Sequence, residues 1–354
     1  MRILVINSGS SSIKYKIFDL PNKEFISKGT IENIGEPGSK FKDHYSGLKS
    51  ILEQVDHIEA VGHRVLHGAE AFKAPVVVND AVVKKIRQCF EMGPLHNPAN
   101  LAGILACKKL LPGIKQVAIF DTEFHQTLPD YAYIYGVPYS LYEKYGVRKY
   151  GFHGTSHQYV SQEAARLLKK PITSLRLITC HLGNGCSIAA VDKGRCIDTS
   201  MGFTPLEGLL MGTRSGDIDP ALVLYIMRKE KLSPEQMDTL LNKQSGLKGL
   251  SGISNDMRIL DEKRSRGDKR ATLALNVFIY RIKKYIGAYS AIMGGCEAVI
   301  FTAGIGENQK NVREEICAGI FDHLKKKPKV MVIPTNEELM IALQTYKLML
   351  GKSK

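Results

Sequence analysis

The sequence predicts an α/β fold that is divided into two domains, and three observations lead to this prediction. A chain of 354 residues is longer than a single hydrophobic core usually accommodates. Short strand-like apolar segments alternate along the chain with segments that have the hydrophobic period of a helix, as in α/β proteins. Finally, residues 2–19 and 176–198 share one pattern: an apolar strand, a turn that contains glycine, and a second strand that opens on Ser-Ile. If this similarity is a duplication, each half begins with the same unit, and ligands would bind in the cleft between the halves.

The individual elements follow from local signals. Residues 3–6 and 13–18 are expected to form strands. A helix is expected over residues 80–92, with Asn79 or Asp80 as its N-cap, and the next helix is expected to start with Asn97 as N-cap and Pro98 at the first helical position. Further helices are expected from near Ser156, from Asp219 and Pro220, from Ser233, and over residues 272–293, where Gly294 and Gly295 end the pattern.

The composition is that of an ordinary globular protein, with 44% hydrophobic and 24% charged residues. No apolar run has the length of a membrane span, and polar Asn7 and Ser8 interrupt what would be the core of a signal peptide. Seven scattered cysteines without a Cys-x-x-Cys pair favour a reduced, cytoplasmic protein. The net charge of +14 fits a basic site for small anions as well as a nucleic-acid surface, but no basic motif with interleaved aromatic residues supports the latter.

Two turns are rich in groups that hold anions. The turn after the first strand contains Asn7, four serines and a glycine, followed by Lys14, so backbone N–H groups, hydroxyls and a lysine could face a phosphate. A merely flexible polar hairpin is the alternative. The segment "CHLGNGCS" places glycines on both sides of Asn184, which would let the backbone approach a ligand closely; a simple tight hairpin explains it equally well.

Two further segments indicate a nucleotide or phosphate site. In "AVIFTAGIGEN", residues 298–308, a buried strand leads into a glycine loop at Gly304 and Gly306 and then into a helix, an order that aims a helix N-terminus at a phosphate. The stretch 199–220 has little helical character and holds Arg214 among Gly212, Ser215 and Gly216. An arginine in such a loop can be directed at an anion.

Several histidines lie near these segments, but a bound transition metal is not favoured. None of the histidine pairs shows the helical spacing with a nearby carboxylate that zinc hydrolases use, since "HGTSH" has glycine in its middle. A Cys180–His181 nucleophile and base pair is also disfavoured, because adjacent strand residues point to opposite faces.

Taken together, these segments resemble the acetate/propionate kinase family of the sugar kinase–Hsp70–actin superfamily. The matching phrases, in order, are "NSGSSSIK", "GHRVLHG", "PLHNPANL", "FDTEFHQTLP", "YGFHGTSH", "HLGNGCSI", "DTSMGFTPLEGLLMGTRSGDIDP", "SGLKGLSGIS", "GIGEN" and "IPTNEEL". The likeness runs from residue 3 to about residue 342. It implies two similar ribonuclease-H-like (actin-like ATPase) domains around a central cleft. We expect the first domain to cover residues 1–123 with a returning helix over 338–354, and the second to cover 124–337.

The resemblance implies a reversible transfer of the ATP γ-phosphoryl group to acetate, which gives acetyl phosphate and ADP. The transfer would be direct and in line, would require Mg²⁺ or Mn²⁺, and would take place in a cytoplasmic homodimer without nucleic-acid or membrane partners. Since acetate is already ionised at neutral pH, no general base is needed. Such a reaction depends on alignment and on neutralising the charge of the phosphoryl group.

Residue roles are implied position by position. Arg64 would hold the substrate carboxylate, Arg214 and His153 would stabilise the transferring phosphoryl group, and Asp121 would lie beside them. Asn7 and Glu337 would hold the metal ion. The acyl pocket would contain Leu66, Leu95, Phe152 and Pro205. The nucleotide would contact Lys14, His181, Leu182, Gly183, Asn184, Gly185, Asp256, Met257, Arg258, Gly304, Ile305, Gly306, Glu307 and Asn308.

The sequence departs from the family pattern in three respects. Met257 stands where the family usually has phenylalanine, which should alter nucleotide affinity. Leu66 stands where acetate kinases often have valine, which should narrow the acyl pocket and favour acetate over longer acids. The segments between Lys28 and Val61 and before Glu337 are shorter than usual. A propionate or broader short-chain acyl kinase, and a non-enzymatic nucleotide-dependent clamp of the same fold, are the alternatives.

Overall fold

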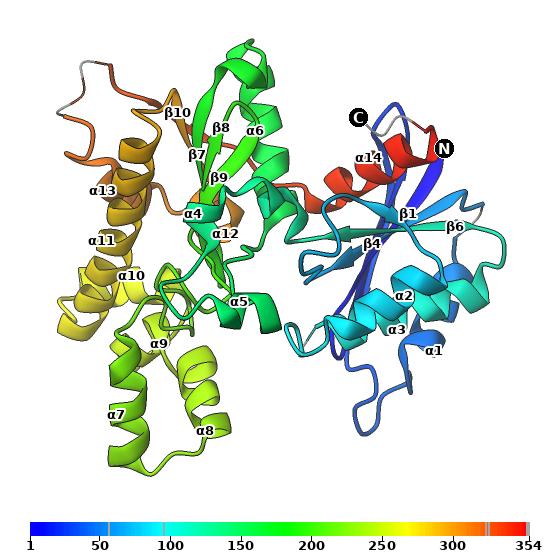
Figure 1. Ribbon diagram of the computed structural model, residues 1–354, viewed down its shortest axis with the longest axis horizontal. Coiled ribbons are helices and arrows are strands. Elements are labelled where there is room, and N and C mark those ends of the chain that lie inside the picture. Colours follow the sequence, from blue (N-terminus) through cyan, green and yellow to red (C-terminus); the bar gives the residue numbers. More distant parts are fainter. Residues whose placement is uncertain (56, 95, 323, 325, 352–354) are drawn as a thin grey trace. The chain divides into compact units, whose positions relative to one another are not determined.

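The computed structural model describes residues 1–55, 57–94, 96–322, 324 and 326–351. These residues form two compact units, each with its own sheet (Figure 1). Unit 1 comprises Met1–Gln126, Gly154–Tyr159 and Asn336–Lys354, and unit 2 comprises Thr127–His153 and Val160–Thr335. The α/β class expected from the sequence is confirmed. The domain boundaries expected from the sequence stay a prediction.

Unit 1 is built on a six-stranded sheet with the order β3-β2-β1-β4-β6-β5. Strands β1, β4 and β6 are parallel, whereas β2, β3 and β5 run antiparallel to their neighbours. The strands are β1 (Arg2–Ser8), β2 (Ile13–Asp19), β3 (Glu24–Ile31), β4 (Ala60–Val65), β5 (Val76–Val77) and β6 (Lys115–Phe120). The helices of this unit are α1 (His44–Leu52), α2 (Asp80–Gln88), α3 (Asn97–Leu110) and α14 (Glu337–Met349), together with the 3₁₀ helix η1 (Glu123–Thr127).

Helices cover both faces of this sheet because β1 is apolar on both sides. Leu4 and Ile6 pack with residues of α1 and α3, whereas Ile3 and Val5 pack with Ile341 of α14. Figure 1 shows α14 on one side of the strands and α1, α2 and α3 on the other. Both faces are therefore buried, as is usual where parallel strands form the centre of a sheet.

Helix α14 crosses β4 at a glycine. A Cβ atom at Gly62 would lie 2.6 Å from Thr345 Oγ1 and 2.8 Å from Ile341 Cγ2, so a larger residue would push the helix away. This close contact brings the start of α14, and with it Glu337, beside the end of β4. The glycine of "GHRV" thus fixes the relation between Arg64 and Glu337 within unit 1.

Unit 2 is built on a five-stranded sheet with the order β11-β10-β7-β8-β9. Its strands are β7 (Arg176–Leu182), β8 (Cys186–Asp192), β9 (Arg195–Thr199), β10 (Ala298–Thr302) and β11 (Lys329–Val332). As in unit 1, an antiparallel meander of three strands is extended by two strands parallel to the first. The order β9-β8-β7-β10-β11 therefore repeats β3-β2-β1-β4-β6, which is the duplication that the two similar sequence segments indicated.

The helices of unit 2 include those expected from Asp219, from Ser233 and over residues 272–293, together with several that were not predicted from the sequence. They are α4 (Asp130–Tyr133), α5 (Ser140–Tyr145), α7 (Pro220–Glu230), α8 (Pro234–Thr239), α9 (Gly246–Ser251), α10 (Met257–Ser265), α11 (Lys269–Ile292), α12 (Ala303–Asn308) and α13 (Lys310–Cys317), with the 3₁₀ helix η2 (Ile172–Ser174) and the π-helical turn η3 (Leu240–Gln244). Helix α6 (Gly154–Leu168) contributes its first residues to unit 1 and the rest to unit 2. Asp219 and Ser233 cap their helices as expected.

Two local expectations were wrong. Asn97 is not the N-cap of α3, because its amide instead binds His67 N–H and the carbonyls of His67 and Cys89, and His96 takes the cap position. Helix α2 ends at Gln88 rather than at residue 92, since the carbonyl of Cys89 turns to accept from Gly93 and Asn97.

The helices offer no membrane segment in the part of the chain that the structure describes. None of them is both long enough and apolar enough to cross a bilayer.

Candidate active site

An arginine and two carboxylates meet in unit 1, where β4, β6 and α14 end or begin. Arg64 Nε donates to Asp121 Oδ1 at 3.0 Å and Arg64 Nη2 donates to Asp121 Oδ2 at 2.6 Å. Glu337 Oε2 lies 3.8 Å from the same Nη2. Asp121 is completely buried, whereas the side chains of Arg64 and Glu337 keep 23% and 19% exposure. The arginine is thus anchored from behind and open to solvent in front.

The electrostatics of this cluster leave room for another cation. Burial opposes the charge of Arg64, but attraction to Asp121 and Glu337 outweighs it and raises the pKa of the guanidinium. Burial also raises the pKa of the Glu337 carboxyl, and Arg64 offsets only part of this effect. Two carboxylates share one arginine here, so an additional positive charge near Glu337 would stabilise the ionised cluster.

The opening turn is a constrained loop. Gly9 N–H donates to Ser12 O at 2.7 Å, the His44 ring bonds Gly9 O at 2.8 Å, and Asn100 Nδ2 donates to Ser8 O at 2.6 Å. This excludes the flexible hairpin that the sequence left open. Asn7 pairs with Lys14 across β1 and β2, so the two predicted ligands of the phosphate and metal region lie side by side.

Asn97 and Asn100 of α3 hold the backbone beside Arg64, a role that was not predicted from the sequence for either residue. Asn100 Oδ1 accepts from Leu66 N–H at 3.0 Å while its Nδ2 binds Ser8 O. Asn97 holds the next residue, His67, through both N–H and carbonyl. One side chain therefore ties the opening turn to the residues that follow Arg64. The signal in the sequence was "NPAN", two asparagines one helical turn apart.

In unit 2, Arg214 lies in an irregular segment, as expected from residues 199–220. Arg214 Nη1 donates to Pro205 O at 3.3 Å and lies 3.8 Å from Met211 Sδ. No carboxylate pairs with it among the residues of known position, and burial lowers the pKa of its guanidinium. A half-buried arginine that has no counter-ion among the described residues is able to bind an anion.

Tyrosines and carboxylates hold this segment in place. Tyr135 O–H bonds Glu207 and accepts from Phe203 N–H at 2.9 Å. Asp217 accepts from Gly208 N–H at 2.8 Å and from Tyr285 O–H at 2.7 Å. The Arg214 loop is thus fixed on both sides, although it has no regular secondary structure.

His153 occupies a strained position beside Arg214. Its φ of 58° and ψ of 26° are left-handed, a conformation that is unfavourable for a residue with a side chain. Its Nδ1 lies 2.9 Å from Ser187 Oγ, and its ring stacks on His181 with centroids 4.1 Å apart. A Cβ atom at Gly185 would lie 3.4 Å from Arg214 Nη1 and 3.6 Å from His153 Cε1. Both side chains therefore reach the same glycine.

A cavity of about 670 Å³ lies next to this cluster within unit 2. Most of the residues expected to bind a nucleotide line it: Gly183, Asn184, Asp256, Met257, Arg258, Gly304, Ile305 and Asn308, together with Asn255 and Gln309. Asn255 Nδ2 donates to Asn184 Oδ1 at 2.9 Å. The carboxylate of Asp256 accepts hydrogen bonds from Arg258 Nε at 3.1 Å and from Arg258 Nη2 at 2.6 Å. Three segments far apart in the sequence thus form one cavity.

Other residues expected at the nucleotide lie elsewhere. Leu182 is completely buried, so its side chain belongs to the core. The expected loop at Gly304 and Gly306 is the short helix α12, because the Glu307 carboxylate turns back to accept Ala303 N–H at 2.8 Å and Thr335 N–H at 3.2 Å. Glu307 therefore stabilises the turn. The residues that do not line the cavity are Lys14, His181, Leu182, Gly185, Gly306 and Glu307.

The expected acyl-pocket residues are distributed over both units. Leu66 is half-buried in unit 1, with its N–H held by Asn100. In unit 2, Phe152 is 1% exposed, and Pro205 is half-buried and accepts from Arg214. Leu95 lies outside the described residues.

Comparisons with known proteins agree over nearly the whole chain. The model of the acetokinase family matches residues 2–52 and 46–323. The acetate kinase of Caldicellulosiruptor saccharolyticus is 50% identical over 397 aligned residues, which include 99% of this chain and 100% of that protein. The crystal structure of Porphyromonas gingivalis acetate kinase has a TM-score of 0.93 and 41% identity, covering 98% of this chain and 99% of the other. A propionate kinase from Francisella tularensis subsp. tularensis has a TM-score of 0.91 and 42% identity, with the same coverage.

The chain is shorter than its relatives. Its 354 residues align over 397 positions with the Caldicellulosiruptor protein, so it lacks residues that the relative has. The family match is split at residues 46–52 and stops at residue 323. Both places lie within or next to the segments that the sequence indicated to be short.

Proposed function

The chain belongs to the acetokinase family, and from this premise we propose that it transfers the γ-phosphoryl group of ATP to acetate. The products are acetyl phosphate and ADP, and the reaction is reversible. The observation that carries the proposal is the cavity lined by residues of "HLGNG", "DMR" and "GIGEN", next to an arginine without a counter-ion. A nucleotide in that cavity would present phosphates to the residues best suited to bind them.

Arg64 is the residue that holds the acetate carboxylate in this proposal. Asp121 accepts hydrogen bonds from Nε and from one N–H of Nη2. The other N–H of Nη2 and the N–H groups of Nη1 lie on another edge of the planar guanidinium. A carboxylate can bind them in a second fork. The buried aspartate keeps Arg64 charged and oriented before substrate binds.

Arg214 and His153 stabilise the phosphoryl group during transfer. The charge of a transferring phosphoryl group is spread over three equatorial oxygens, so several donors in fixed positions serve it better than one strong base. Among the residues that the structure describes, no carboxylate forms an ion pair with Arg214, so its N–H groups can serve the phosphoryl group. The His153 ring is oriented by the hydrogen bond between its Nδ1 and Ser187 Oγ, and in this proposal it donates to a phosphoryl oxygen.

The residues expected to hold Mg²⁺ fit that ion by their chemistry. An amide oxygen from Asn7 and a carboxylate from Glu337 are hard oxygen ligands, and Mg²⁺ in kinases is commonly held by one or two carboxylates together with substrate phosphates. The uncompensated burial of Glu337 favours a cation beside it. When bound, the ion would supply charge neutralisation at the phosphate oxygens. Mn²⁺ has the same ligand preference.

Acetate is proposed over longer acids because of Leu66. A larger side chain at this position removes volume that an additional methylene would need, which is worth about 1–3 kcal/mol in discrimination. The similarity to a propionate kinase makes propionate the second candidate. A nucleotide-dependent clamp without transfer does not require Arg64, Arg214 and His153 together. Seven free cysteines fit a reducing cytoplasm, and a homodimer is part of the same proposal.

The proposal is tested by trapping acyl phosphate with hydroxylamine after incubation with Mg²⁺-ATP and acetate, propionate or butyrate. We expect the highest kcat/KM with acetate, and loss of product in Arg64→Ala. Arg87→Ala, at an exposed arginine of α2, is the matched control and should remain active. A preference for propionate would overturn the interpretation of Leu66. A lack of product with all three acids would overturn the proposed function.

A further inference from the structure

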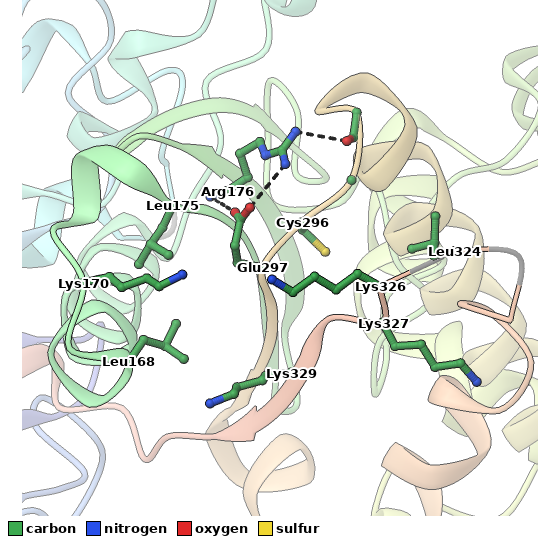
Figure 2. Close-up of a pocket in the computed structure, with 12 residues that line it drawn as sticks. Leu168, Lys170, Leu175, Arg176, Cys296, Glu297, Leu324, Lys326, Lys327 and Lys329 are labelled. Atoms are coloured by element: carbon green, nitrogen blue, oxygen red, sulfur yellow. Dashed lines mark hydrogen bonds and ion pairs between the residues drawn. The ribbon is translucent and has the colours of Figure 1, made fainter.

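We propose that unit 2 contains a second anion site, separate from the nucleotide cavity, that binds a small organic anion with several negative charges. The site is a cavity of about 320 Å³ at the amino ends of β7, β10 and β11. Figure 2 shows it with Lys170, Lys326 and Lys329 at its opening and Arg176 and Glu297 behind them.

The only carboxylate among the lining residues is already neutralised by Arg176. Glu297 Oε1 accepts from Arg176 Nη2 at 3.2 Å, and Glu297 Oε2 accepts from the backbone N–H of Arg176 at 2.6 Å. Arg176 Nη1 donates to the carbonyls of Met293 and Gly294 at 2.9 and 3.0 Å. This pair is therefore a fixed wall of the cavity and contributes almost no net charge.

Three of the lysines that line the cavity are exposed and lie near one another without a paired carboxylate among the described residues. Within the described ranges, no ion pair joins a carboxylate to Lys170, Lys326 or Lys329. Lys327 also lines the cavity, but its ammonium group is paired with Asp322 at 2.6 Å. Since like charges around one cavity repel, a multivalent anion would relieve this repulsion.

The lysines approach the cavity from segments that are distant in sequence. Lys170 follows α6, whereas Lys326 and Lys329 precede or open β11. In Figure 2 the ammonium groups of Lys170 and Lys326 point toward one another across the opening. Lysine binds phosphate and carboxylate as a movable point charge. Leu168, Leu175 and Leu324 also line the cavity, so it offers an apolar contact for the carbon skeleton of the ligand.

The site is independent of phosphoryl transfer. Strand β10 begins at Ala298 beside Glu297 and ends at Thr302 beside the nucleotide-lining residues, so the two cavities lie at opposite ends of the same strands. The family match stops at residue 323, before Lys326 and Lys329. The second site therefore uses none of the residues that the proposed function assigns to phosphoryl transfer.

The test is isothermal titration calorimetry at low ionic strength with the full chain saturated with Mg²⁺-ADP, so that the nucleotide cavity is occupied. Pyrophosphate and propane-1,2,3-tricarboxylate are the two probes. We expect binding of at least one at a single site, and the probe that binds more tightly identifies a phosphorylated or a polycarboxylate ligand. Absence of heat from both probes at millimolar concentration would overturn the proposal.

Substitutions that remove a positive charge and one that removes a negative charge should change the affinity in opposite directions, which makes the test specific. Lys170→Gln/Lys326→Gln should weaken binding about tenfold or more, whereas Lys243→Gln/Lys269→Gln, at two exposed lysines of the same unit, should not change it. Glu297→Gln should strengthen binding, because it frees the charge of Arg176. Equal affinity in the wild type and the Lys170/Lys326 variant, with unchanged thermal unfolding of the free proteins, would overturn the site.

Discussion

Arg64 and Asp121 form a two-bond pair of 3.0 and 2.6 Å in which the carboxylate is fully buried and the guanidinium is not. Asp121 follows β6 directly and Arg64 lies on the neighbouring strand β4, so the pair is set by the sheet itself. The buried partner fixes the plane of the guanidinium, and the open edge of that plane is where a carboxylate substrate would bind.

Arg64→Lys should reduce activity although it conserves the charge. Lysine cannot make the fork to Asp121 and a second fork to substrate at the same time. Loss of one charge-assisted hydrogen bond is worth about 1.5–3 kcal/mol, so kcat/KM for acetate should fall about tenfold to a hundredfold. Steady-state kinetics checks this, with Arg87→Lys as the control. Full activity of Arg64→Lys would show that the fork is not required.

Ser187→Ala should lower kcat more than it changes the KM values. Ser187 Oγ orients the His153 ring through Nδ1, and a neutral hydrogen bond of this kind contributes about 0.5–1.5 kcal/mol. A decrease in kcat of about twofold to tenfold is therefore expected. Ser187→Thr, which retains the hydroxyl, should restore most of the rate. If the two variants behave alike, His153 is positioned by other contacts.

Asn100→Ala should weaken binding of both substrates, although Asn100 lies outside the expected set of ligands. Its amide joins Ser8 O to Leu66 N–H, so its loss leaves two buried backbone groups without a partner and costs about 1–3 kcal/mol. We expect higher KM values for both Mg²⁺-ATP and acetate, together with a lower Tm. A lower Tm with unchanged KM values would limit Asn100 to a structural role.

Glu123 should make stability depend on pH. Burial raises the pKa of this carboxyl from 4.5 to about 8, although Phe120 N–H and Gln344 Nε2 donate to it. Below pH 4.5 it is protonated in both the folded and the unfolded state. Between the two pKa values only the unfolded state loses the proton, so the free energy of unfolding falls by up to about 1.4 kcal/mol per pH unit.

The matched variant for this effect is Glu123→Gln, which cannot ionise. Its stability relative to the wild type should increase as the pH rises from 5 to 8 and then level off. Denaturant unfolding at several pH values measures the difference. A difference that stays constant over this range would mean that Glu123 is ionised in the folded protein.

Met257→Phe should change nucleotide affinity without abolishing transfer. Met257 is 3% exposed and lines the nucleotide cavity at the start of α10. An aromatic ring there could stack on a base, which is worth about 0.5–1.5 kcal/mol, so we expect ATP to bind about twofold to tenfold more tightly. Comparable ATP affinity in the two proteins would remove Met257 from the determinants of nucleotide binding.

Local patterns predicted the fold class, and the family resemblance named eight of the ten residues that line the larger cavity of unit 2, whereas long-range contacts decided other features. The similar strand–turn–strand segments indicated a duplication, and the two sheets do share one strand order. Asn97 precedes a proline at the start of a helix, as an N-cap residue often does. Its side chain instead forms hydrogen bonds with the backbone N–H and carbonyl of His67. Glu307 stays a predicted nucleotide contact, and the sequence did not indicate that its carboxylate also accepts from Ala303 N–H. The hydrogen bond from Gln344 Nε2 to Glu123 Oε1 joins residues far apart in the chain, so it could not be predicted from a local sequence pattern.

The lack of a counter-ion at Arg214 could not be predicted for a similar reason. Which carboxylates reach an arginine depends on the tertiary course of the loops, and here Glu207 and Asp217 are taken by Tyr135 and Tyr285. The sequence placed Arg214 in a flexible-looking glycine-rich segment. The structure adds that the segment is held by these hydrogen bonds and that no carboxylate among the described residues forms an ion pair with Arg214.

Transfer of the phosphoryl group to an acetate oxygen is tested most directly with acetate labelled with ¹⁸O in both carboxylate oxygens. After incubation with Mg²⁺-ATP, ³¹P NMR of the acetyl phosphate should show the isotope shift of one bridging ¹⁸O, since the attacking oxygen stays bound to phosphorus. Acetyl phosphate without this shift, or the absence of acetyl phosphate, would contradict direct phosphoryl transfer to a carboxylate held by Arg64.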